Sequence, residues 1–89
     1  MTEAAVLLRE RLAALEPEVL EIHDDSHEHA GHAEARGGGH FSVLIVSEAF
    51  SGLNRLSRHQ QVYRMVGDLV PHPVHALSIK ALTPEEFPS

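Results

Sequence analysis

The first apolar repeat of the chain has the three- and four-residue spacing of an amphipathic helix. It runs over residues 2–15, and the apolar positions on this spacing are Ala5, Leu8, Leu12 and Leu15. Thr2 is a suitable N-cap and Glu3 suits the positive end of a helix. Pro17 ends the repeat, because the residue before a proline is pushed out of the α region. The pattern therefore predicts a first helix over residues 2–15.

Three further runs have the patterns of β-strands. In residues 18–24, Leu20 and Ile22 alternate with polar neighbours, which is typical of a half-buried strand. Residues 40–47 (HFSVLIVS) are apolar at both parities and rich in β-branched side chains, as in a central strand that is covered on both faces. Residues 74–81 (VHALSIKA) form the third predicted strand.

A second helical stripe lies between the second and third predicted strands. Its members are Leu56, Tyr63, Val66 and Val70. The helix begins at Asn54 or at a capping box of Ser57 and Gln60, and Pro71 ends it. After the third strand, Thr83 at the N-cap and Pro84 at the first helical position predict a short last helix.

The order of these elements predicts an α+β fold in a single domain over residues 1–89, arranged α-β-β-α-β-α. A helix that joins the second and third strands carries the chain across one face of the sheet, so these strands should be parallel. We therefore expect a three-stranded mixed sheet with its helices on one face. Residues 25–39 (DSHEHAGHAEARGGG) have no apolar period and end in three glycines, which predicts a mobile loop.

Histidine makes up a large share of the chain, and cysteine is absent. The chain has eight histidines and no cysteine, so thiolates for a soft metal must come from another molecule. The formal charge is −6, and protonating all eight histidines would raise it by eight, to +2. The acidic balance disfavours contact with phosphates, while charge and metal affinity should both depend on pH between about 5 and 7.

Several function classes lack their sequence signals. The chain has no nucleophile elbow, no phosphate-binding glycine loop before a helix and no HExxH motif, so we expect that it is not an enzyme. The first residues have no basic region, and Arg9, Glu10 and Arg11 interrupt the apolar positions. This pattern predicts neither a signal peptide nor a membrane span, and hence a cytoplasmic protein.

Three stretches together resemble the BolA family: DDSHEHAGH (residues 24–32), HFSVLIVSEAFSGLNRLSRHQQVY (residues 40–63) and VHALSIKALTPEEF (residues 74–87). The resemblance implies a fold like the type II K homology domain. It also implies a heterodimer with a monothiol glutaredoxin, in which a [2Fe-2S] cluster is shared between glutaredoxin, glutathione and histidines of the BolA-like chain. The function would then be iron-sulfur cluster trafficking or assembly, or iron-linked regulation. The isolated chain would hold no cofactor tightly. It would be a monomer or a weak homodimer.

The same resemblance implies which histidines ligate the cluster. One ligand precedes the ALSIKA stretch and matches His75, and the other lies in the long loop and matches His29. His27 and His32 are alternates because they lie in the same glycine-rich segment.

The residues themselves leave other interpretations open. By spacing alone, a histidine on a strand is more often a packed or surface side chain than a ligand, and His75 shares parity with Leu77 and Ile79. The loop histidines also match an adventitious zinc or nickel chelator. His59 falls on the stripe of the second helix, where packing is its expected role.

The alternative function is that of a DNA-binding transcriptional regulator, as the family is associated with transcriptional regulation. It would use the second helix and the third strand. The candidate nucleic-acid contacts are Arg55, Arg58, Arg64 and Lys80. A solvated helix face is the competing interpretation of these arginines, and the acidic net charge and scarce aromatic residues limit any DNA binding to a weak, salt-sensitive kind.

Overall fold

The computed structural model describes residues 3–25, 39–71 and 73–87. The helices in these ranges are α1 (Glu3–Leu12) and α2 (Arg55–Val66), and the strands are β1 (Val19–Asp24), β2 (Gly39–Val46) and β3 (Val74–Leu82). Short 3-10 helices lie at η1 (Ala13–Leu15), η4 (Glu48–Phe50) and η5 (Gly67–Leu69). None of the described helices is long and apolar enough to cross a membrane.

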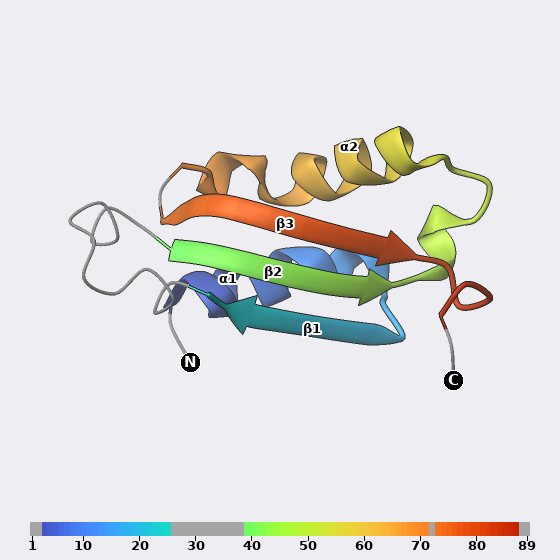
Figure 1. Cartoon of the computed structure of the whole chain (residues 1–89), viewed down its shortest axis with the longest axis horizontal. Helices are drawn as coiled ribbons and strands as arrows, with labels where there is room; N and C mark the ends of the chain where they lie inside the picture. Colours follow the sequence, from blue (N-terminus) through green and yellow to red (C-terminus); the bar gives the residue numbers. More distant parts are fainter. Residues whose placement is uncertain (1–2, 26–38, 72, 88–89) are drawn as a thin grey trace.

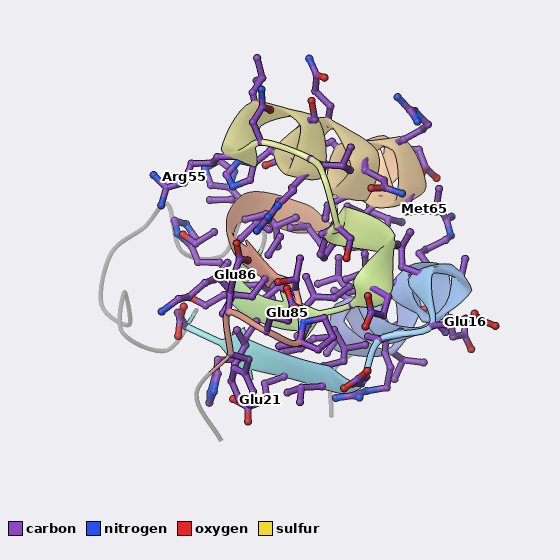
Figure 2. All side chains as sticks on the ribbon, turned by 90° about the vertical axis from the view of Figure 1, so that its right-hand side faces the viewer. Glu16, Glu21, Arg55, Met65, Glu85 and Glu86 are labelled. Carbon is purple, nitrogen blue, oxygen red and sulfur yellow. The ribbon has the colours of Figure 1, made fainter. Side chains whose placement is uncertain are left out.

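The strands form one mixed sheet in the order β1-β2-β3 (Figure 1). β1 pairs with β2 in antiparallel fashion, and β3 pairs with β2 in parallel fashion after the crossover through α2. Both helices lie on the same face of the sheet, as Figures 1 and 2 show from two directions. The α+β fold with a three-stranded mixed sheet and helices on one face is therefore confirmed.

The core lies between the helices and one face of the sheet. Its most buried side chains from these elements are Leu8, Leu12, Ile45, Val62, Val66 and Val74. On β2, alternate residues Phe41, Val43 and Ile45 are buried against the helices, and Ser42 and Leu44 are only partly covered. Because side chains alternate along a strand, the second set, which includes His40, lies on the open face.

The rotation of α2 differs from the predicted stripe. Leu56 is 66% exposed and Tyr63 is 38% exposed, whereas Val62 and Val66 are fully buried. The face toward the sheet begins with Arg58, because its guanidinium Nη1 donates a hydrogen bond of 3.0 Å to the Ala81 carbonyl of β3. The predicted core positions Leu56 and Tyr63 were therefore wrong, while Val66 was correct.

The predicted last helix is also wrong, because the segment after β3 forms a tight turn. The Glu86 amide donates to the Thr83 carbonyl at 3.0 Å, and the Thr83 amide donates back to the Glu86 carboxylate at 2.9 Å. The Glu86 carboxylate thus accepts from the Thr83 amide, as the third residue of a helix does in a capping box. The same carboxylate also forms an ion pair with Arg58 at 2.6 Å. The local capping signals are present and close a turn.

Candidate functional site

His75 lies at an irregularity near the start of β3. The register passes from Gly39–Val74 to His40–Ala76, so His75 is an extra residue on β3 without a Cα partner on β2. Val74 is buried and Leu77 also packs against the core, although residues three apart in a regular strand point to opposite faces. A bulge of this kind re-aims side chains. It places His75 off the core face, where it is exposed, instead of with Leu77 as alternation along the strand had indicated.

The imidazole rings of His40 and His75 lie beside each other. Their ring centroids are 5.1 Å apart and the ring planes are inclined by 36°. His40 is half-buried and comes from β2. The sequence offered no spacing signal for it, because its position relative to His75 depends on strand pairing across the sheet.

The backbone holds both histidines at a well-anchored corner of the sheet. The Asp25 amide donates to the His40 carbonyl at 2.6 Å, and the Gly39 amide donates to the Pro73 carbonyl at 3.2 Å. A Cβ atom at Gly39 would lie 2.3 Å from a ring atom of Phe41, so glycine is required for this close approach. The two imidazoles thus stand on strands and not on a loop.

The donors at this corner fit a metal only in part. Two neutral imidazoles suit iron, zinc or copper, but they do not complete a coordination sphere. In the part of the chain that the structure describes, no three histidine, aspartate or glutamate side chains gather closely enough to hold a metal ion. A metal bound there would therefore take its remaining ligands from outside the described residues. The predicted ligand His29, its alternates His27 and His32, and most of the predicted mobile loop lie outside the described residues.

The guanidinium of Arg58 is engaged within the chain. It donates to the Leu53 carbonyl at 2.9 Å and to both carboxylate oxygens of Glu86 at 2.6 and 3.1 Å, in addition to Ala81. The hydrogen bonds from Arg58, and then that from the Thr83 amide, lower the pKa of Glu86 from its ordinary 4.5 to about 2. Arg58 therefore joins α2, β3 and the turn after β3.

Arg55 and Lys80 line one pocket of about 500 Å³ with Arg58, between the start of α2 and the end of β3. Figure 2 shows Arg55 and Glu86 at this end of the molecule. His59, for which we expected a packing role, is half-buried and lines the same pocket. Arg64 lines a separate depression beside Gln60 and Gln61, so the structure groups three of the four candidate cations.

The same fold and similar sequences occur in known proteins. Chloroplastic BOLA1 of Arabidopsis thaliana is 45% identical over 87 residues, which cover 92% of this chain and 54% of that protein, so the chain spans about half the length of this relative. The DNA-binding transcriptional regulator BolA of Haemophilus influenzae is 35% identical over 81% of this chain and 68% of its own. The solved BolA domain of SufE1 from Arabidopsis thaliana has a TM-score of 0.83 at 38% identity and covers 98% of this chain and 99% of that one.

The match to a family model covers most of the chain. Residues 12–86 match the model of the BolA-like protein, which includes all three strands, α2 and the histidine pair. The chain belongs to the BolA-like protein family.

Proposed function

We propose that this chain is the histidine-bearing partner of a monothiol glutaredoxin and shares a glutathione-ligated [2Fe-2S] cluster with it. The observation that carries the proposal is the exposed imidazole of His75, which the bulge in β3 turns toward a second imidazole on a rigid sheet. The likeness to the BolA domain of a SufE protein supports a link to iron-sulfur chemistry. BolA-family proteins act as regulators or partners rather than as enzymes, which agrees with this role.

The residues of the chain limit how it takes part. Without cysteine it offers no thiolate, so the thiolates have to come from glutaredoxin and glutathione. His75 would bind iron, and neutral imidazole in place of thiolate raises the reduction potential of a [2Fe-2S] cluster. The paired strands fix the backbone at His75, so that little backbone freedom is lost when the complex forms.

A spectroscopic titration tests this proposal. The full chain is added to cluster-loaded monothiol glutaredoxin, and the visible absorption and circular dichroism of the cluster are followed. We expect a change that saturates at one chain per glutaredoxin and that is absent in His75→Ala. The matched control is His23→Ala, because His23 is also an exposed histidine on a strand and lies on β1. No spectral change with the wild-type chain, or an unaltered change with His75→Ala, would refute the proposal.

Binding to DNA is a second candidate function, favoured by the named activity of the Haemophilus influenzae relative and by the pocket that Arg55 and Lys80 share. The net charge of −6 opposes it. If both side chains contact phosphates, Arg55→Ala and Lys80→Ala should each weaken binding to a duplex and reduce the salt dependence of log K by about one. Unchanged salt dependence in the double variant would exclude this surface.

A further inference from the structure

We infer that His40 and His75 form a two-imidazole chelate for a single metal ion, so that the second ligand from this chain is on the sheet. The inference rests on the proposed function for the identity of the metal as cluster iron. It names His40 as a ligand in place of the loop histidine that the family resemblance implies. Binding of a simple metal ion by the pair is measurable in this chain alone.

The spacing of the two rings is that of a chelating pair. An imidazole nitrogen binds a metal such as zinc at about 2.0–2.1 Å, which puts the ring centre about 3 Å from the metal, and two such rings at a tetrahedral angle are about 5 Å apart. The observed distance between the ring centroids of His40 and His75 is 5.1 Å. The distance between the rings therefore suits one ion bound by a nitrogen of each ring.

The strands hold the pair in this arrangement. Amides on either side anchor it, from Asp25 to the His40 carbonyl and from Gly39 to the Pro73 carbonyl. The extra residue in β3 brings His75 beside His40, whereas a regular strand would have kept His75 on the parity of Leu77. A site on paired strands is held more precisely than one on a loop.

Within the described residues the pair leaves the coordination of a metal incomplete, which agrees with a site that is shared. In residues 3–25, 39–71 and 73–87 no third donor joins the pair to make a group that could hold a metal by itself. In Rieske centres two histidines bind one iron of a [2Fe-2S] cluster, and cysteines bind the other. Two imidazoles from this chain thus match the two iron ligands that remain when a partner supplies two thiolates to the cluster.

The test uses Co²⁺ as the probe and a full-length chain in which His27, His29 and His32 are alanine, so that the loop histidines cannot chelate. We expect this chain to bind one Co²⁺, seen as visible d–d absorption. Loss of an outer-shell partner alone costs about 10–100-fold in metal affinity, so removal of His40 or His75 as a direct ligand should weaken Co²⁺ binding by at least about tenfold.

The controls separate a ligand role from a structural one. The chain in which His27, His29 and His32 are alanine is the loop variant. His23→Ala added to the loop variant should leave its Co²⁺ affinity unchanged. Thermal melting shows whether each variant folds. Imidazole ¹⁵N shifts of His40 and His75 on addition of Zn²⁺ provide a second measurement that needs neither substitution. No saturable binding in the loop variant, binding that His40→Ala leaves unchanged, or unshifted imidazole resonances would overturn the inference.

The same variants distinguish this inference from the proposed function. The chain without His27, His29 and His32 and the His40→Ala chain are each added to cluster-loaded glutaredoxin. If the first still changes the spectrum of the cluster and the second does not, the proposed function and the assignment of His40 as a ligand both hold. If the loop variant loses the change while His40→Ala retains it, glutaredoxin partnership stands and the ligand assignment to His40 is wrong. If Co²⁺ binds the pair but no chain alters the glutaredoxin spectrum, the metal site stands and the partnership is wrong.

Discussion

Ser47 connects three separate parts of the fold through one buried hydroxyl. It is only 1% exposed, and its Oγ donates to the Leu15 carbonyl at 2.6 Å. The same oxygen accepts from the Ala49 amide at 3.0 Å and so caps η4, while the Ser47 amide donates to the Leu82 carbonyl. Ser47→Ala keeps the backbone bond and removes both side-chain bonds.

The expected cost follows from these two bonds. An acceptor left unsatisfied in the interior costs about 1–3 kcal/mol. A lost N-cap costs about 0.5–2 kcal/mol. Because the Ala49 amide is only partly buried and can turn to water, we expect Ser47→Ala to lower the free energy of unfolding by about 2–4 kcal/mol, out of about 5–13 kcal/mol for 89 residues.

Urea unfolding followed by far-ultraviolet circular dichroism measures this cost. The matched control is Ser51→Ala in the same region, since the Ser51 hydroxyl only bonds the exposed Glu48 carboxylate at 3.1 Å. The control should change the free energy of unfolding by less than about 0.5 kcal/mol. If Ser47→Ala were no more destabilising than this control, the buried hydroxyl would not connect these elements as described.

Three further predictions test other parts of the fold. The pKa of Glu86 in the folded chain is about 2, below its ordinary 4.5, so its ion pair stabilises the fold fully above pH 4.5 and loses this effect as the pH falls toward 2. Glu86→Gln should therefore lose less stability than the wild type between pH 4.5 and 2. Parallel curves of unfolding free energy against pH for the two chains would contradict this. Gly39→Ala should lower the free energy of unfolding by about 1–3 kcal/mol, because the new Cβ would overlap the Phe41 ring. Gly67→Ala has open space around a new Cβ and should leave the stability unchanged or slightly raised. Thermal melts of both variants measure the difference. Leu56→Ala should change the free energy of unfolding by less than about 0.5 kcal/mol, because the side chain is 66% exposed. Val62→Ala should lower it by more than about 1 kcal/mol, because Val62 is fully buried. Equal losses of stability in the two variants would show that α2 is rotated differently.

Local patterns in the sequence were enough to predict the two helices, the three strands and their topology, but not the turn after β3. The apolar run of β2 predicted its central place in the sheet, which is correct. The expectation that both faces of this strand are covered was wrong, because the helices lie on one face (Figures 1 and 2) and Ser42 and Leu44 on the other are only partly covered. The helix between the second and third strands required a crossover, and a crossover requires parallel strands, as β2 and β3 are. Family membership followed from three long stretches with consistent order, which the family match over residues 12–86 confirms.

Which residues meet across these elements was decided only by the tertiary structure. The rotation of α2 depends on Arg58 reaching Ala81 and Glu86, which lie 23 and 28 residues away in sequence. The direction of His75 depends on a bulge, which alternation along one strand does not encode, and its partner His40 comes from the neighbouring strand. Periodicity reports which side of an element is apolar, whereas register and rotation are set by contacts between distant segments, and the candidate metal pair exists only at that level.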